Sequence, residues 1–251
     1  FSFDEPLQVQ TSGWEQGPIY VLWRAIHGYD IYMDRFSIPF ASNSYNWLFF
    51  KIYGEIVKGV MNILSLGSPW IPTIARFLTL FGVLLGVFVA YRSFVVALDI
   101  RDRDFKLLSL AFAVFVMTGP LIGFSAFTVR PDTWALFFEI AAVWLFWSSW
   151  RRYGYLPSST VIGIAVLVIF AWSFKQMYVF ALGGIGLLLL FKRQFKPLVI
   201  LSAVNVTYWA VIFFLGGPMY IQNILFLDYP MTYSVGHAWV IFINFATKSS
   251  P

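Results

Sequence analysis

From residue 73 onward the chain is a succession of apolar runs, most of them close to the roughly 20 residues that a membrane-spanning helix requires. Apolar residues make up 59% of the chain and charged residues only 12%, about half the average for soluble domains. This composition excludes a soluble globular enzyme, a disordered chain and a nucleic-acid-binding module. We therefore predict an all-α fold, a polytopic membrane helical bundle occupying residues 71–216. The expected spans are 73–95, 106–127, 132–150, 157–174, 176–192 and 197–216.

The loops between the runs alternate in charge, and this alternation predicts how the bundle is oriented. Positively charged loops remain on the cytoplasmic side of a membrane. The segment 1–70, the turns at 130 and 175 and the tail 217–251 are therefore expected outside. We expect a multi-pass protein of a bacterial plasma membrane, cut at both ends from a longer chain. Three loops hold nine of the 17 basic residues, namely Arg92, Arg101, Arg103, Lys106, Arg151, Arg152, Lys192, Arg193 and Lys196.

The outward segment 1–70 contains no run long enough to cross a membrane. The Asp4-Glu5-Pro6 sequence is typical of a helix start, because an acid caps free N–H groups and Pro suits the first turn. We expect that helix to end near His27, before Gly28, and a second helix to run from Ser44 to about Leu64. In the second helix polar residues recur at helical spacing and form one stripe, which is typical of a helix lying in the membrane interface. We therefore expect two juxtamembrane helices packed over the outer ends of the spans. The stripe consists of Lys51, Glu55, Lys58 and Asn62.

Charged residues at membrane depth are candidates for a functional site, because they are costly unless paired or hydrated. Arg130 and Asp132 flank Pro131 in a very short outward turn. Glu139 lies two helical turns beyond Asp132, about 10 Å deeper at 1.5 Å per residue. One hypothesis is that Arg130, Asp132 and Glu139 line an outward-facing wet cavity. The alternative for Glu139 is a buried structural pair with a basic or hydroxyl partner on a neighbouring span.

Nine acids, Glu15 among them, are counted on the outward side, and for most of the nine the favoured interpretation is an ordinary solvated loop acid. Lys175 lies in a second outward turn, where it could meet an anionic group such as a lipid phosphate or extend to the headgroups. The two histidines form no metal-binding pattern, although a carboxylate-bound divalent cation is left open. The Gly183-Gly184-x-Gly186 sequence lies within an apolar run and predicts close helix packing. The chain has no Cys, which excludes disulfides and thiolate metal sites.

The order of these motifs resembles the GT-C fold of membrane glycosyltransferases. The resemblance covers essentially the whole chain and is closest to the protein O-mannosyltransferase-like and lipid A aminoarabinose transferase-like members. The matching elements are the outward Asp4-Glu5 helix start, the Gly-Tyr-Asp-Ile-Tyr-Met-Asp turn at 28–34, Ile38-Pro39-Phe40, the Arg-Pro-Asp turn at 130–132 and the Phe-Lys-Gln turn at 174–176.

The resemblance implies transfer of a sugar from a polyprenyl-phosphate carrier to an extracytoplasmic lipid, glycan or protein acceptor. It implies Asp4 as the general base, with Glu5 as the second acid of the pair. Asp132 would be a further positioning acid. Phosphate partners would be Arg130 and Lys175, with Arg24 and Arg35 as further candidates, and direct displacement would invert the anomeric centre. A first span would precede Phe1, and no cofactor beyond the open divalent cation is implied.

Two other classes of function stay open. One is a transporter for a lipid-linked sugar, which would use the same outward cavity, although no convincing internal repeat supports it. The other is a non-catalytic structural subunit that works with partner subunits in a larger membrane complex.

Overall fold

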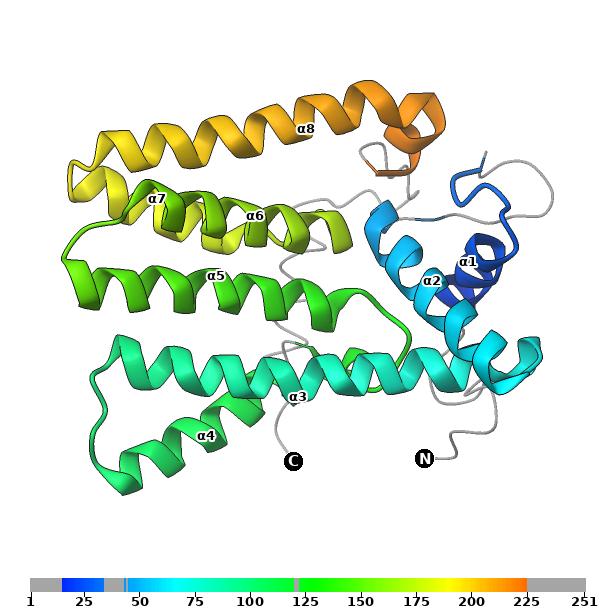
Figure 1. Ribbon diagram of the computed structural model, residues 1–251, viewed down its shortest axis with the longest axis horizontal. Helices are drawn as coiled ribbons and strands as arrows, with labels where there is room; N and C mark the ends of the chain where they lie inside the picture. Colours follow the sequence, from blue (N-terminus) through cyan, green and yellow to red (C-terminus); the bar gives the residue numbers. More distant parts are fainter. Residues whose placement is uncertain (1–14, 34–42, 44, 120–121, 225–251) are drawn as a thin grey trace, which may run out of the picture.

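The computed structural model describes residues 15–33, 43, 45–119 and 122–224, and secondary structure within these residues is helical throughout (Figure 1). The α-helices are α1 (Gln16–Ile26), α2 (Trp47–Leu64), α3 (Ile71–Ala97), α4 (Arg103–Thr118), α5 (Asp132–Tyr153), α6 (Ser158–Phe174), α7 (Phe180–Phe191) and α8 (Phe195–Ile224). Two short 3-10 helices, η1 (Ser68–Trp70) and η2 (Gly123–Ala126), precede α3 and α5.

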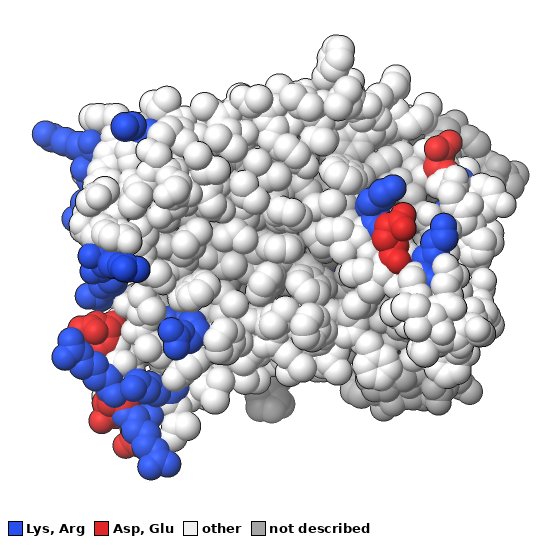
Figure 2. All heavy atoms as spheres, in the orientation of Figure 1, with Lys and Arg blue, Asp and Glu red and all other residues white. Residues whose placement is uncertain are grey.

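Helices α3, α5, α6, α7 and α8 lie side by side, so the connecting loops gather at two opposite ends (Figure 1). The basic end contains the α3–α4, α5–α6 and α7–α8 loops. The capped end contains the turns before α5 and after α6, with α1 and α2 lying across it. Charged side chains follow the same division on the face shown in Figure 2, where a broad uncharged zone separates a large group at the basic end from a smaller group at the capped end.

The predicted apolar runs correspond in position to the helices α3–α8, with two main differences in length that local chemistry explains. The helix in the second run is shorter than predicted because α4 ends at Thr118. Gly119 is extended there (φ −82°, ψ −166°) and Pro120 follows it, and a residue before Pro is disfavoured in helical conformation. The last helix is longer than predicted, because α8 continues to Ile224 across a kink. Gly217 has φ 72° and ψ 175° at this kink, immediately before Pro218.

Two segments, Ser68–Ala97 and Phe195–Ile224, are long and apolar enough to cross a membrane. Their surfaces are apolar as well. On α3 the exposed side chains Phe77, Phe81, Leu84 and Phe88 recur at helical spacing and form one stripe. On α8 Phe214 is 87% exposed. Helices α6 and α7 are apolar but shorter.

The amphipathic helix predicted at 44–64 is confirmed as α2. All four residues of the predicted polar stripe are exposed, and Lys51 and Glu55 form a 3.9 Å ion pair on it. The opposite face packs onto α1, α3 and α6, with Phe49, Phe50 and Val57 fully buried. Of the first predicted helix only the part from Gln16 is described, and its proposed start at Asp4–Pro6 lies outside the described residues.

The prediction of close packing at Gly183, Gly184 and Gly186 is wrong. A Cβ atom at Gly183 or Gly184 would meet nothing within 4 Å, and one at Gly186 would make an ordinary 3.8 Å contact. The close contacts lie on α3 instead. A Cβ atom at Gly82 would lie 2.8 Å from the Trp134 ring, and one at Gly86 would lie 2.2 Å from Met117. These glycines allow α5 and α4 to pack tightly onto α3.

Candidate functional site

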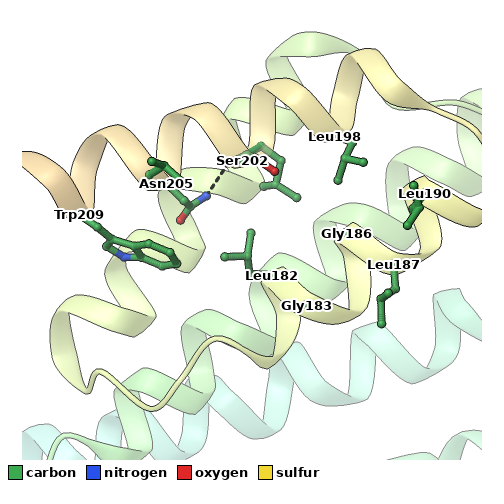
Figure 3. Close-up of a pocket in the computed structure, with 11 residues that line it drawn as sticks. Leu182, Gly183, Gly186, Leu187, Leu190, Leu198, Ser202, Asn205 and Trp209 are labelled. Atoms are coloured by element: carbon green, nitrogen blue, oxygen red, sulfur yellow. Dashed lines mark hydrogen bonds between the residues drawn. The ribbon is translucent and has the colours of Figure 1, made fainter. Parts of the chain in front are cut away.

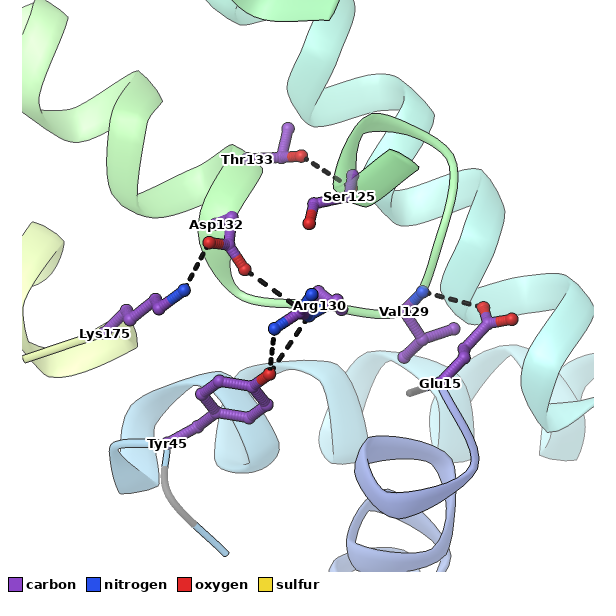
Figure 4. A network of polar contacts seen from close by, with 8 residues as sticks. All are labelled: Glu15, Tyr45, Ser125, Val129, Arg130, Asp132, Thr133 and Lys175. Atoms are coloured by element: carbon purple, nitrogen blue, oxygen red, sulfur yellow. Dashed lines mark hydrogen bonds and ion pairs between the residues drawn. The ribbon is translucent and has the colours of Figure 1, made fainter. Parts of the chain in front are cut away.

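A cluster of charged and aromatic side chains lies at the capped end, beneath α2 (Figure 4). Asp132 is the first residue of α5 and Arg130 precedes it in the turn, whereas Lys175 directly follows the end of α6. The turn is held by Thr133, whose hydroxyl donates to the Ser125 carbonyl at 3.2 Å. Helix ends from two sides of the bundle therefore bring these three charges together.

Asp132 is shared between the two cations. Lys175 Nζ forms a hydrogen-bonded ion pair with Asp132 Oδ1, and Arg130 Nε lies 3.7 Å from Asp132 Oδ2. All three side chains are 12–16% exposed. Two cations and one carboxylate leave this part of the described chain with one net positive charge. A partly buried cationic surplus of this kind favours an anionic ligand.

Two tyrosines complete the cluster. Arg130 Nε donates to the Tyr45 hydroxyl at 3.0 Å, and the cations of Arg130 and Lys175 each lie 5.6 Å from the Tyr45 ring centroid. Lys175 also lies 6.0 Å from the Tyr178 ring. Burial raises the pKa of Tyr178, and the charges of Asp132 and Glu139 raise it further. A hydrogen bond between the Tyr178 side chain and Asp132 acts in the same direction, so Tyr178 remains a neutral phenol bonded to the shared carboxylate.

A second charged group at the capped end is structural and fully buried. Arg76 on α3 donates to Glu15 through Nε at 3.0 Å and Nη2 at 2.8 Å, and the Val129 N–H donates to the same carboxylate at 2.8 Å. This contact joins the start of α1, α3 and the turn before α5. Glu15 is therefore an exception to the solvated role expected for most of the outward acids, because it folds onto a charge inside an apolar helix.

Glu139 makes a different contact from the one that the wet-cavity hypothesis requires. Its Oε2 atom accepts a hydrogen bond from the Ala181 N–H at 2.8 Å, in the first turn of α7. The side chain is 5% exposed and lines a cavity of about 410 Å³ whose walls are mainly apolar. The alternative hypothesis is correct in placing Glu139 in a buried contact with a neighbouring helix, but the partner is a backbone N–H group and not a basic or hydroxyl side chain.

The other predicted site residues are not part of the cluster as described. Arg24 lies near the end of α1, where it donates to the Asp30 carbonyl at 2.8 Å and its guanidinium lies 5.5 Å from the Tyr29 ring. Asp4, Glu5 and Arg35 lie outside the described residues. Within the described ranges, no three His, Asp or Glu side chains are grouped so that they could hold a metal ion.

Sequence reasoning missed Tyr45, Tyr178 and Arg76. Tyr178 follows Lys175 by three residues, a signal that could have placed it in the cluster. Arg76 was detectable as one of the two charges within the predicted span 73–95, the other being Arg92 near the end of that span. Tyr45 is separated from Arg130 by 85 residues, and no local pattern indicates that pair.

A groove of about 380 Å³ also lies between α7 and α8 (Figure 3). Leu182, Gly183 and Gly186 form the α7 side, and Asn205 and Trp209 extend from α8. Asn205 donates to the Leu201 carbonyl at 2.9 Å on its own helix. The groove is lined mostly by apolar side chains.

Comparison of the chain with family models, with curated proteins and with solved structures finds no match in any of the three.

Proposed function

We propose that this chain is part of a multi-pass membrane glycosyltransferase of the GT-C type. It would transfer a sugar from a polyprenyl-phosphate carrier to an acceptor on the extracytoplasmic side. The single observation that carries the proposal is the cationic cluster of Arg130, Lys175 and Asp132 at the capped end, opposite the basic loops. A lipid phosphate lies at the membrane surface, which is the level expected for this cluster if the bundle spans the membrane.

The chemistry requires few protein groups, because the sugar on a polyprenyl phosphate is already activated. The acceptor hydroxyl oxygen forms a bond to the anomeric carbon, and the bond from that carbon to the phosphate oxygen breaks. The leaving polyprenyl phosphate takes the electron pair, and the acceptor proton passes to a carboxylate. Arg130 and Lys175 would stabilise the phosphate as it gains charge.

The carboxylate that accepts the proton is proposed to be Asp4, assisted by Glu5, from the resemblance alone. In membranes containing the intact protein, Asp4→Asn should abolish sugar transfer without lowering the amount of folded protein. Unchanged function in that variant would favour a structural subunit or a transporter.

Phosphate recognition can be tested separately from turnover. Farnesyl phosphate should bind the chain in phosphatidylcholine proteoliposomes, and uncharged farnesol should bind more weakly. Lys175→Met should lower the affinity for farnesyl phosphate about tenfold, the loss expected for a charge-assisted contact. Lys175→Arg should restore most of it. Lys192→Met at the basic end is the matched control, and an equal loss in both Met variants would overturn the assignment.

Orientation has its own test, because the natural chain lacks cysteine. Single cysteines at Asn62 on the exposed stripe of α2 and at Ser158 in the first turn of α6 lie at opposite ends of the bundle. In intact cells a membrane-impermeant maleimide should label Asn62→Cys and leave Ser158→Cys unlabelled until the membrane is opened. The reverse pattern would place α1 and α2 in the cytosol and end the proposal.

A further inference from the structure

The cavity beside Glu139 is a second candidate binding site, separate from the proposed phosphate site. It lies between α3, α4, α5 and α7, and the walls near its centre include Phe94, Val143 and Ile185. Its volume of about 410 Å³ is within the range of small-molecule sites, roughly 300–1,000 Å³. Gly184 and Leu188 on α7 line it and are exposed on the apolar surface. The cavity can therefore be reached from the side of the bundle.

Glu139 supplies this cavity with an unused acceptor. One carboxyl oxygen, Oε2, is occupied by the Ala181 N–H. The other, Oε1, is buried and has no hydrogen-bond partner among the described residues. A buried carboxyl oxygen without a partner is costly, because burial removes its hydration without replacement. The site therefore gains free energy from a ligand that donates a hydrogen bond to Oε1.

The remaining polar atoms of the lining lie at the other end of the cavity. Trp147 follows Glu139 by eight residues on α5, about 12 Å along the helix. Ser93 on α3 lies at a similar height in the bundle. Arg151 of α5 donates to the Ala97 carbonyl of α3, Trp147 lies four residues before Arg151, and Ser93 lies four residues before Ala97. An ordered water needs two to four polar partners. Around Glu139 Oε1 the walls are apolar, so a water there would find few.

We propose that this cavity binds a membrane-dissolved amphiphile that has a hydrocarbon body and one O–H or N–H donor. The donor would bond to Glu139 Oε1 and the hydrocarbon would fill the space between α5 and α7. A polyprenyl-phosphate sugar does not meet this description, because its headgroup carries a charged phosphate and several sugar hydroxyls instead of one donor. The proposal is therefore independent of the glycosyltransferase assignment.

The test uses the full chain in phosphatidylcholine proteoliposomes, since that lipid has no O–H or N–H donor. The probe is a long-chain alcohol with a diazirine in the middle of its chain. Photolabelling of α5 and α7 peptides should be saturable. Unlabelled dodecanol or dodecylamine should compete, and dodecyl methyl ether, which has no donor, should not. Equal competition by the methyl ether would overturn the proposal, because it would reveal an apolar space without headgroup recognition.

Adjacent glycines on α7 provide a matched pair of variants. Gly184 lines the Glu139 cavity, whereas Gly183 lines the α7–α8 groove of Figure 3. An added Cβ atom would meet nothing within 4 Å at either position. Gly184→Leu should fill the cavity and lower labelling about tenfold or more, equivalent to at least about 1.4 kcal/mol, whereas Gly183→Leu should leave it within about twofold. Equal labelling of wild type and Gly184→Leu would refute the site.

The variant Glu139→Gln distinguishes a ligand whose donor is an ammonium group from one whose donor is a hydroxyl group. Gln keeps an acceptor for the Ala181 N–H but has no negative charge. An ammonium ligand should lose most of its affinity in this variant, whereas a hydroxyl ligand should lose little, because the Gln amide can exchange hydrogen bonds with it. The cationic class is assigned if dodecylamine competes better than dodecanol in the wild type and loses that advantage in Glu139→Gln. The alcohol class is assigned if dodecanol competes at least as well as dodecylamine in the wild type and equally well in Glu139→Gln.

Discussion

The two ends of the bundle use charge in different ways. At the basic end charges are exposed, as in the 3.5 Å contact between Arg101 and Asp99, whose side chains are 86% and 58% exposed. At the capped end the Arg76–Glu15 pair is only 2–3% exposed. Each exposed charge adds little to the stability of the fold, so exposed charges act mainly through their number and sign. A buried charge affects stability strongly, because it needs a specific partner at the correct distance. Substitutions at the two ends should therefore have very different consequences.

The largest effect is expected from Arg76→Met. It leaves Glu15 buried with only the Val129 N–H as a described donor, and breaking a buried pair costs about 3–5 kcal/mol. The unfolding free energy in micelles, measured by SDS titration, should fall by about that amount. The double variant Arg76→Met with Glu15→Gln should recover part of the loss, because the uncompensated charge is removed. A loss below about 1 kcal/mol for Arg76→Met would show that the pair does not hold the capped end.

A smaller loss is expected at the cationic cluster. Lys175→Met removes the closer of the two cations from Asp132, while Arg130 remains 3.7 Å away. Hydrogen bonds to charged groups contribute about 1.5–3 kcal/mol, so the unfolding free energy should fall by about 2 kcal/mol in the same titration. Lys175→Arg is the matched control and should remain close to wild type. A loss as large as that of Arg76→Met would indicate a structural role for Lys175.

Much of the fold could be predicted because its determinants are local. Apolar runs determine where most of the helices lie from their immediate neighbours. The break at Gly119-Pro120 is equally local, but the predicted span 106–127 ran across it, whereas α4 ends at Thr118. The proximity of Arg130, Asp132 and Lys175 followed from topology, since alternate turns of an up-and-down bundle meet at one end. These predictions needed no knowledge of side-chain packing.

The contacts that failed to emerge from sequence depend on packing between distant elements. Tyr45 reaches Arg130 because of the angle at which α2 crosses the bundle. Glu15 reaches Arg76 because α1 folds back onto α3. Glu139 binds Ala181 because α7 begins at that level beside α5, a position that the apolar run 176–192 does not reveal.

At the basic end one acid has a structural role through the backbone. Asp102 precedes α4 and accepts hydrogen bonds from the N–H groups of Asp104 at 2.8 Å and Phe105 at 3.3 Å. Loss of such a cap typically costs about 1 kcal/mol. Asp102→Ala should lower the unfolding free energy by that amount, and Asp102→Asn, which keeps the cap, should not. Equal losses in both variants would show that the charge matters rather than the cap.

The smallest effect on stability, and the sharpest contrast, is expected for the exposed cations. Arg101→Ala should change the unfolding free energy by no more than about 0.5 kcal/mol, the usual range for exposed charges. Joint replacement of Arg151, Arg152, Lys192 and Arg193 by Gln should also cost less than Arg76→Met alone. It should nevertheless weaken the orientation signal, because basic loops determine which end remains cytoplasmic. The single-cysteine labelling at Ser158 would then become mixed, with part of the population labelled from outside. If Ser158→Cys stayed unlabelled from outside while the unfolding free energy fell strongly, the basic end would have the structural role that is proposed here for the capped end.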